Sequence, residues 1–547
     1  MANTTCCCNN VTSTRFNSGD LGLPFITEWS AGVGDDIAFT INKVGSYRFI
    51  VDWGDGSPPE RIIHTVKTLP SSSQIDPSTL LSISHTLIAP PIDAQPRYSV
   101  QIYGLFRGWT IATASKPKII KQTHYGEVGF LLAGAYSDCI NFNEFLAGDI
   151  GKIPAQAMTN STGLRSTFKG CTSLVTFDFG EFDYDGGGVL AGNMFQNCSN
   201  LVTVDMSNTS AFRPKPFNQA GCTVMFQNCT SLENIDVSDW NMGSTTTIYD
   251  MFNNCRSLPF LDVSNWNISN IEGMQRSFFN CRSLNNFDVS SWDTTKIKSF
   301  LDCWSACSQL QYLDTSNWNT PNLKELRRTF SGCANLLSSN DHPSGLDLSG
   351  WITNKITDMY QCFASCRAIT QYDMSLWETP ALQNLFGTFA QNDNVTDINI
   401  GLNFVTTNVT SMMDTFKLCP LLPSLNIAHW RTPNVTVFGS MFAGCESLVD
   451  FDYSEFVLTS VPAWTGGLSN VSMRFFTEAS VPSAGPVPNV LSNQTVFSNF
   501  LVKQDTAGGY PAAVSMGNSM SYITSIAGTA FNNLTANGWS FLTTSGV

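Results

Sequence analysis

Cysteine is the residue type in this chain whose spacing most readily suggests chemistry. Seventeen cysteines occur in 547 residues, and from Cys229 to Cys333 they recur every 26 residues four times in succession. A column of thiols can bind a metal, form disulfides or pack as small buried side chains. The cysteines of this series are Cys139, Cys171, Cys198, Cys229, Cys255, Cys281, Cys307, Cys333, Cys366, Cys419 and Cys445.

The spacing favours buried thiols over metal ligands or disulfides. A metal site requires paired Cys-x-x-Cys or His ligands, and the nearest pairs are Cys303/Cys307 and Cys362/Cys366, four positions apart. Stacked chain turns would place like cysteines about 4.8 Å apart, but with parallel Cβ vectors that a disulfide cannot bridge. Asn392 stands at one position of the series in place of cysteine. A small core position tolerates this replacement. We therefore expect buried thiols, no metal and no cofactor.

Aspartate and tryptophan recur at fixed distances after the cysteine and suggest two further chemistries. An Asp such as Asp236 usually stands seven positions after the Cys, and a column of carboxylates could bind Ca²⁺ or polarise a sugar. Regular recurrence favours the alternative, in which each carboxylate caps backbone N–H groups of the next turn. A Trp eleven positions after the Cys could stack on sugars, but its fixed slot predicts a core or ridge residue. These tryptophans include Trp240, Trp266, Trp292 and Trp318.

Interruptions of the pattern are better candidates for a specific site than its regular slots. The acidic, glycine-rich stretch with Glu181, Asp183 and Asp185 is a candidate binding loop. A seven-residue insert at 338–344 is a second candidate. The alternative interpretation of both is a solvated surface loop.

The sequence carries no catalytic signature. Only five His occur, none in a His-Glu-x-x-His arrangement, and neither a Gly-x-x-x-x-Gly-Lys loop nor a Gly-x-Ser-x-Gly motif is present. The net charge of −14 argues against a nucleic-acid partner, because an acidic surface repels the phosphate backbone. The longest apolar stretches fall far short of the roughly 20 residues that span a bilayer, so we expect no membrane insertion. These features predict a protein that is not an enzyme.

A repeated structural unit must position the recurring residues. An aromatic residue stands three positions before every slot and an apolar residue three positions after it, over twelve units. Each unit holds a short apolar strand that cannot bury its inner face alone, so successive units should stack as a solenoid. A second apolar pair, such as Ile271 and Met274, predicts a second strand or a tight helical turn in each coil. The aromatic column includes Phe226, Phe252, Phe278, Trp304 and Phe330.

The repeat resembles that of BspA-like leucine-rich-repeat surface proteins. Met225–Trp240 and Met251–Trp266 share the pattern MF-x-x-C-x-SL-x-x-(I/L)DVS-x-W, and the likeness extends from about Gly126 to about Tyr453. Irregular units around residues 180–222 leave the coil boundaries there open. The resemblance implies a leucine-rich-repeat-like fold. It also implies a non-enzymatic role in adhesion, for a family found on bacterial surfaces and in phages and large viruses.

The N-terminal part of the chain differs from the repeat in charge and pattern. Residues 1–124 carry nine acids and ten bases, whereas the rest carries 34 acids and 19 bases. Alternating apolar residues and glycine turns predict an all-β module over about 21–110. The combination of Val51–Gly56, His85 and Tyr98–Val100 resembles polycystic-kidney-disease (PKD) type β-sandwich domains. The resemblance implies a spacer or interaction module that would mount the solenoid.

The first residues of the chain are polar and predict an extended arm. Cys6, Cys7 and Cys8 stand together in it; they could crosslink neighbouring chains as exposed thiols or be an ordinary part of the arm. The basic and apolar regions of a secretory signal are not seen there. We therefore expect assembly into a particle inside a cell.

Together these features predict a mainly β protein. We expect an N-terminal PKD-like β-sandwich, then a leucine-rich-repeat-like solenoid with short helical turns, then a C-terminal cap. The expected divisions are 1–20 for the arm, 21–110 for the sandwich, 111–455 for a solenoid of about twelve coils, and 456–547 for a capping or attachment region.

The function expected from this organisation is adhesion or host recognition without catalysis. We expect a virion surface protein, such as a phage tail fibre, a receptor-binding protein or a head decoration protein. Its partners would be other virion proteins and a host-surface glycan or protein, and it could form a homo-oligomer. A bacterial cell-surface adhesin and a tailspike-like polysaccharide depolymerase are the open alternatives. A pair of acids outside the repeat slots, at glycosidase separation, would favour the depolymerase.

Overall fold

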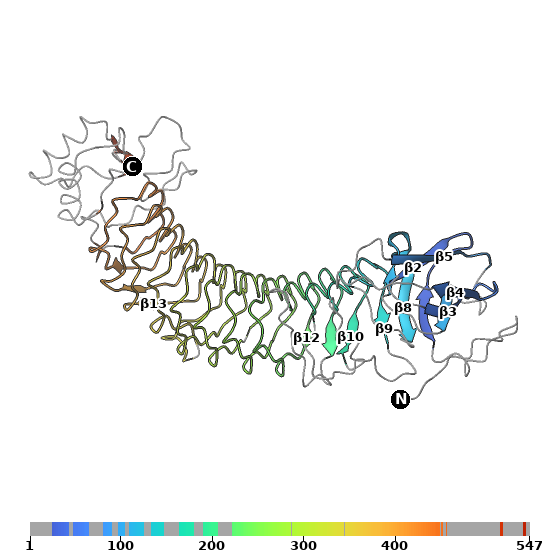
Figure 1. The fold of residues 1–547 in the computed structure, drawn as a ribbon. Helices are drawn as coiled ribbons and strands as arrows, with labels where there is room; N and C mark the ends of the chain where they lie inside the picture. The colour runs from blue at the N-terminus through green and yellow to red at the C-terminus, as the bar shows by residue number, and fades with distance from the viewer. Residues whose placement is uncertain are drawn as a thin grey trace, which may run out of the picture. The chain divides into compact units, whose positions relative to one another are not determined.

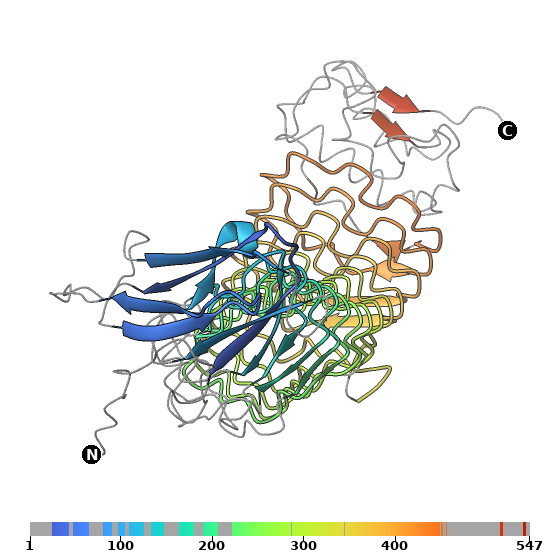
Figure 2. The same ribbon diagram turned by 90° about the vertical axis from the view of Figure 1, so that its right-hand side faces the viewer.

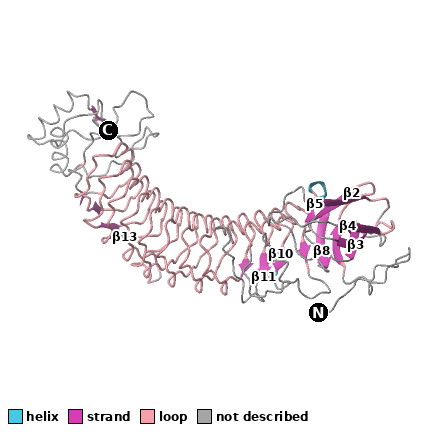
Figure 3. Ribbon diagram, viewed as in Figure 1, coloured by secondary structure: helices cyan, strands magenta, loops and turns pink. Residues whose placement is uncertain are grey.

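The computed structural model describes most of residues 24–451 and little beyond them. The described residues are 24–42, 47–64, 80–89, 97–103, 109–124, 133–146, 164–179, 190–205, 221–285, 287–343, 345–448, 450–451, 456, 515–517 and 540–542. The chain divides into two units, Met1–Trp266 and Asn267–Val547. Figures 1 and 3 show short strands joined by loops and turns. Within the described ranges, no helix is long and apolar enough to cross a bilayer.

Two sheets form the N-terminal module, and their strands run antiparallel except for β9 (Figure 2). The first sheet has the order β4 (Glu60–His64), β3 (Tyr47–Asp52), β6 (Tyr98–Tyr103), β1 (Phe25–Trp29), β8 (Ile119–His124) and β9 (Glu144–Phe145). The second has the order β5 (Leu80–Thr86), β2 (Asp36–Asn42) and β7 (Thr110–Ile111), and a 3-10 helix, η3 (Thr113–Ser115), follows β7. Alternate residues of β1 and β6 are buried, as expected for strands with one face on a core.

Aromatic side chains from both sheets share one core. The ring of Trp109, which precedes β7, lies 4.6 Å from that of Phe25 on β1 and 4.5 Å from that of Phe39 on β2. Phe39 also lies 5.9 Å from Trp53, and all four rings are almost fully buried. Large aromatic side chains bury much apolar area, so this cluster holds the two sheets together.

The solenoid begins as a continuation of the first sheet. Strand β9 belongs to the first coil and pairs in parallel with β8 of the module. The buried Gln122 of β8 accepts a hydrogen bond from the Tyr136 hydroxyl and donates one to the Leu146 carbonyl at 3.3 Å. The strands of the module therefore run past residue 110, to His124, and the predicted boundary at 110/111 is too early.

Parallel strands stack from coil to coil on one side of the solenoid. In unit Met1–Trp266 these are β10 (Thr176–Asp178), β11 (Thr203–Asp205) and β12 (Asn234–Ile235). In unit Asn267–Val547 they are the pairs β13 (Gln371–Met374) with β14 (Asp397–Ile400) and β15 (Ser424–Leu425) with β16 (Asp450–Phe451). Beyond the described coils, β17 (Ser515–Gly517) pairs in parallel with β18 (Ser540–Leu542). Most of the predicted cap at 456–547 lies outside the described residues.

The aromatic residues before the cysteines stack face to face within each unit. In the first unit Phe226 lies 5.3 Å from Phe252 with the ring planes 9° apart. In the second unit Phe278 lies 6.3 Å from Trp304, which lies 5.6 Å from Phe330. Each of these rings is fully buried, so the column is the centre of the hydrophobic core.

A ribbon of turns, rather than a second strand, carries the aromatic column. In a typical coil the N–H of Phe278 donates to the Cys303 carbonyl of the next coil at 3.0 Å, while the N–H of Cys281 donates to the Phe278 carbonyl at 3.2 Å. The residue directly before the slot has positive φ in all twelve coils, for example 60° at Asn280. Asn, Asp and Gly tolerate this conformation best, and they fill eight of these positions. Where the sequence predicts a second strand or tight helical turn, the second unit has single-residue parallel bridges, such as Gly273 with Ser299, followed by these turns.

Candidate functional site

The cysteine column is part of the core. All fourteen cysteines in the described ranges are free and buried. The thiol of Cys229 donates to the Phe195 carbonyl of the preceding coil at 3.1 Å, and that of Cys307 to the Phe278 carbonyl at 3.0 Å. Burial raises the pKa of Cys307 to about 12, so its thiol stays protonated. Cys6, Cys7 and Cys8 lie outside the described residues.

Asn392 shows why the slot accepts a residue other than cysteine. Its amide nitrogen donates to the Phe363 carbonyl of the preceding coil at 3.0 Å and to the Phe389 carbonyl at 2.7 Å. The slot therefore requires a small buried donor that satisfies a backbone carbonyl, and both thiol and amide supply one. Within the described ranges, no group of three His, Cys, Asp or Glu could hold a metal ion.

The recurring aspartates cap backbone turns. Asp236 accepts hydrogen bonds at one carboxylate oxygen from the backbone N–H of Ser238 at 3.0 Å and from its hydroxyl at 2.7 Å. The same pair of bonds recurs at Asp262, Asp288, Asp314 and Asp347. This geometry is an Asx turn, which forms a corner of each coil.

The recurring tryptophans lie inside the solenoid. Trp240 and Trp266 stack at 6.2 Å, and Trp292 and Trp318 stack at 6.4 Å. Each is only 2% exposed. The indole N–H of Trp266 donates to the Val237 carbonyl at 2.9 Å. These rings are therefore not available to stack on a sugar.

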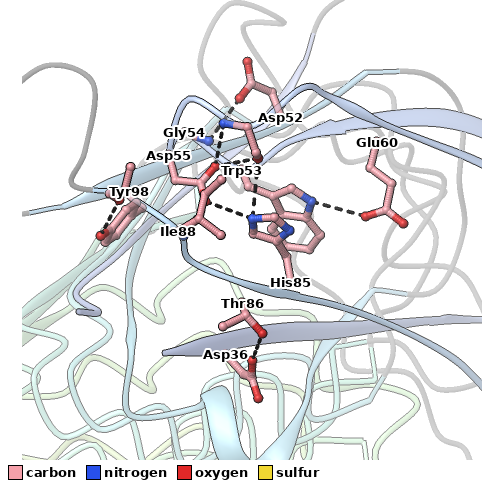
Figure 4. Close-up of polar contacts among 12 residues, drawn as sticks. Asp36, Asp52, Trp53, Gly54, Asp55, Glu60, His85, Thr86, Ile88 and Tyr98 are labelled. Carbon is pink, nitrogen blue, oxygen red and sulfur yellow. Dashed lines mark hydrogen bonds and ion pairs between the residues drawn. The ribbon is translucent and has the colours of Figure 1, made fainter. Parts of the chain in front are cut away.

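A polar network in the N-terminal module combines Ser, His and Asp (Figure 4). The Ser57 hydroxyl donates to Asp55 Oδ1 at 2.6 Å, and His85 Nε2 lies 2.9 Å from Asp55 Oδ2. The Ser57 oxygen is 3.5 Å from His85 Nε2, and the Ile88 N–H also donates to the carboxylate. A nucleophilic triad requires the histidine between serine and aspartate. Here the aspartate lies between them, so the network is not a nucleophilic triad.

The network fixes the turn after β3 onto β5. The side chain of Asp55 is fully buried, and the Trp53 ring stacks on His85 at 5.0 Å with the planes 10° apart. Burial alone would raise the pKa of Asp55, but hydrogen bonds from Ser57, Ile88 and His85 outweigh it and lower the pKa to about 2. A hydrogen-bonded carboxylate that is charged at neutral pH suits a structural role better than proton transfer.

The insert at 338–344 is tied to the coils on both sides of it. The His342 ring lies 4.3 Å from Tyr312 of the preceding coil. Asn340 donates to the Gln371 side-chain oxygen of the following coil at 2.9 Å, and Asp341 accepts from the Thr370 hydroxyl at 2.6 Å. Residue 344 lies outside the described residues. The insert is thus a fixed projection rather than a loose loop.

A small hollow lies where the insert meets the following coil. It measures about 250 Å³ including the space open to solvent. Apolar side chains, including the buried Tyr372, form its floor, and polar groups including Asn340, Gln371 and Asp373 line the rim. Small-molecule pockets are usually larger, so this hollow is unlike a small-molecule site.

The outward face beside the hollow is polar. Along β13 and β14 every second residue is buried, and the positions between them face solvent. The outward side chains are Gln371, Asp373, Asp397 and Asn399. Burial and the charge of Asp373 raise the pKa of Asp397, as expected for two neighbouring carboxylates. The sequence pattern pointed to the insert, but not to Tyr312 and Gln371, which occupy ordinary repeat slots.

The other predicted binding loop is not described. Glu181, Asp183 and Asp185 lie at 180–189, outside the described residues. Their candidacy stays a prediction.

Family comparisons identify the repeat over part of the solenoid. Residues 164–238 match the family described as BspA type leucine rich repeat region (6 copies). Residues 220–343 and 335–456 match a family described as a Mycoplasma protein of unknown function, DUF285. The predicted BspA-type repeat is thereby confirmed for residues 164–238. These matches begin at residue 164, so the PKD-like interpretation of the N-terminal module stays a prediction.

Solved structures with some likeness include a leucine-rich repeat protein and the Toll–Spatzle complex. A leucine-rich repeat protein from Bacteroides ovatus is 15% identical, with 58% of this chain and 82% of that chain covered and a TM-score of 0.24. The Toll–Spatzle complex of Drosophila is 13% identical, with 65% and 49% covered and a TM-score of 0.19. Scores this low carry no argument. No curated protein matches the chain.

Proposed function

We propose that this protein is a non-enzymatic surface protein whose solenoid binds a host-surface glycan or protein. The observation that carries the proposal is the insert at 338–344, whose side chains are held by Tyr312 on one side and by Thr370 and Gln371 on the other. A projection fixed on both sides loses little conformational entropy when a partner binds. The rigid repeat supplies the platform, as binding loops on rigid scaffolds require.

The polar face beside the insert supports recognition of a broad partner. Gln371, Asp397 and Asn399 stand side by side on adjacent parallel strands, with donors and acceptors facing solvent. The hollow is too small to enclose a small substrate. The arrangement fits a partner that lies across the surface of several coils.

The absence of catalysis is part of the proposal and has physical support in the described residues. The repeat thiols are buried, and burial raises the pKa of Cys366 and Cys445 to about 12. A thiol nucleophile needs the opposite, a lowered pKa and access to solvent. The Asp55 carboxylate is committed to hydrogen bonds within the N-terminal module.

We place the protein on a virion surface, as a tail fibre, receptor-binding protein or head decoration protein. The BspA-type repeat supports a surface location in general. The direct joining of β8 to β9 supports a rigid mount, with the PKD-like module as the base of the solenoid. A bacterial cell surface is the alternative location. Mass spectrometry should find the chain in purified virions; recovery only from a cell-envelope fraction would favour the bacterial adhesin.

Binding of host cells tests the role of the insert. The labelled full-length chain should bind the cells, and a variant with Asn340→Ala, Asp341→Ala and His342→Ala should lose at least tenfold in apparent affinity by flow cytometry. A control with Asp393→Ala and Asn394→Ala changes two exposed residues of a regular turn and should bind normally. Equal binding by all three proteins would overturn the proposed site. Release of reducing ends from host polysaccharide would overturn the non-enzymatic role.

A further inference from the structure

We propose that a second surface of the solenoid binds a protein partner that presents a carboxylate next to apolar side chains. The inference rests on the proposed recognition function and names a partner class at a different place from the insert. The surface is the slot six positions before the cysteine position in five successive coils of unit Asn267–Val547. We call it the arginine–aromatic strip; its residues are Leu301, Arg327, Tyr360, Phe386 and Met413.

Stacking holds the centre of the strip rigid. The Arg327 guanidinium carbon lies 4.3 Å from the centroid of the Tyr360 ring. The Tyr360 ring in turn stacks on Phe386 at 4.8 Å with the planes 10° apart. A guanidinium held flat on an aromatic ring keeps its N–H edge in one orientation, so little entropy is lost when an anion binds to it.

Arg327 has donors to offer to a partner. Among the described residues its side chain makes no hydrogen bond, and the nearest carboxylate oxygen, on Asp358, lies 3.9 Å away. The Arg327 side chain is 38% exposed. The neighbouring Arg328 differs, because its Nε and Nη2 donate to the two oxygens of the buried Asp302 at 2.6 and 2.8 Å. The planar fork of Arg327 is therefore the group that fits a carboxylate from outside.

The charges around the strip favour a local contact over a polyanion. A third arginine, Arg276, lies near Arg328. The carboxylates beside these arginines are Asp302, which pairs with Arg328, and Asp358, which forms an ion pair with Arg327 at 3.9 Å; Glu325, two positions before Arg327, accepts from the Ser299 hydroxyl at 2.8 Å. The surface is thus balanced in charge on a chain of net charge −14. A polyanion gains no long-range attraction there, whereas one carboxylate can bind at short range.

The composition of the strip is that of a protein interface. Aromatic residues, Met and Arg are enriched in the buried centres of interfaces, and Tyr and Arg are frequent hot spots. All five side chains of the strip are partly exposed. In the coils at the two ends of the unit, the same slot holds Gln275 and Gly439. Within unit Asn267–Val547 the apolar and aromatic residues are therefore particular to these five coils and are not demanded by the fold, although Tyr249 fills the same slot in a coil of the other unit.

Peptide selection tests the proposal. A random dodecapeptide library displayed on phage is selected against the full-length chain, and an enriched peptide is measured by fluorescence anisotropy. Enriched peptides should carry Asp or Glu beside aliphatic residues, and Arg327→Gln should weaken binding at least tenfold. Tyr360→Leu, which removes the stacking partner of Arg327, should weaken it as well. The control Arg367→Gln removes the same charge from an exposed arginine in another slot, 3.5 Å from Asp393, and should leave binding unchanged.

Four outcomes decide the matter. No sequence enrichment, equal affinity of Arg327→Gln and the natural chain, or equal loss in Arg367→Gln would each overturn the proposal. Arg327-dependent binding of alginate without peptide binding would overturn the protein class of partner. Unreactive repeat thiols in native Arg327→Gln would show that the variant is folded. If peptide binding does not depend on Arg327 while the insert variant still loses cell binding, the proposed function stands and only the strip fails.

Discussion

Truncation of one ring in the aromatic column should weaken a few coils and leave the others intact. Phe389 is fully buried between Phe363 at 5.6 Å and Phe416 at 5.5 Å, and Tyr372 meets it edge-on at 5.3 Å. Replacing a buried Phe by Ala typically costs about 3 to 5 kcal/mol, because contacts are lost and a cavity remains. Each stacked pair contributes about 0.5 to 1.5 kcal/mol to such a cost. We therefore expect Phe389→Ala to lie near the upper part of this range.

Hydrogen exchange detects where the loss falls. In a solenoid each coil contacts only its neighbours, so the opening free energy should fall in adjoining coils alone. The Phe363 N–H, which donates to the Thr388 carbonyl at 2.9 Å, and the Phe389 N–H, which donates to the Thr415 carbonyl at 2.8 Å, report on these coils. A loss of about 3 to 5 kcal/mol corresponds to exchange at least about 10²-fold faster. Amides near Cys307, in the same unit, should exchange as before.

A matched control separates packing from general disturbance. Leu402 follows Phe389 in the same coil but is 75% exposed, so Leu402→Ala should change protection by no more than about 0.5 kcal/mol. Unchanged protection in Phe389→Ala would refute the burial of the column. Equal loss over the whole of unit Asn267–Val547 would refute the one-dimensional description of the solenoid.

Three further predictions concern other parts of the fold. The pKa of Asp55 is lowered from 3.8 to about 2. The charged carboxylate therefore adds roughly 2 kcal/mol to the free energy of unfolding above pH 3.8, and this stabilisation is lost as the pH falls toward 2. Unfolding followed by Trp fluorescence should show this dependence, and Asp55→Asn should remove it; identical pH profiles would contradict the network. The Cys419 thiol donates to the Phe389 carbonyl at 3.0 Å. Cys419→Ala should therefore lower the stability measured by thermal unfolding by about 1 to 3 kcal/mol, and Cys419→Ser should lower it by less. An equally stable Ala variant would show that the thiol donor is dispensable. Gln122→Leu removes the side-chain oxygen that accepts from the Tyr136 hydroxyl. Hydrogen exchange in residues 133–146 should then become about tenfold faster or more. Unaltered exchange there would argue against coupling of the module to the first coil.

The core of the solenoid could be predicted because each coil repeats the same demands. Phe226 and Phe252 occupy equivalent slots, so stacking of identical coils must bring them together, as the distance of 5.3 Å shows. The same logic places Cys229 in the core and accounts for Asn392, since both supply a buried donor. Periodicity determines such contacts without knowledge of the path of the chain.

The candidate surfaces could be predicted only in part. The insert at 338–344 was evident as a break in the period, but its contacts with Tyr312 and Gln371 depend on which slots of adjacent coils face outward. Arg327 and Tyr360 occupy the same slot of successive coils but lie 33 positions apart, because the insert lengthens the chain between them. Neither pair carries a motif that could identify it in the sequence.

The amino-acid sequence by itself determined that much of the chain is a β solenoid, with BspA-type repeats over residues 164–238 and a buried column of rings and thiols. It could do so because burial of one apolar face per coil imposes a period that is written in the order of residues. Only the tertiary structure decided that β8 joins the N-terminal sheet to the first coil, that single bridges followed by turns stand where a second strand is predicted, and that Arg327 lies on Tyr360. These features depend on strand pairing, backbone conformation and the orientation of outward side chains, which no repeat position constrains.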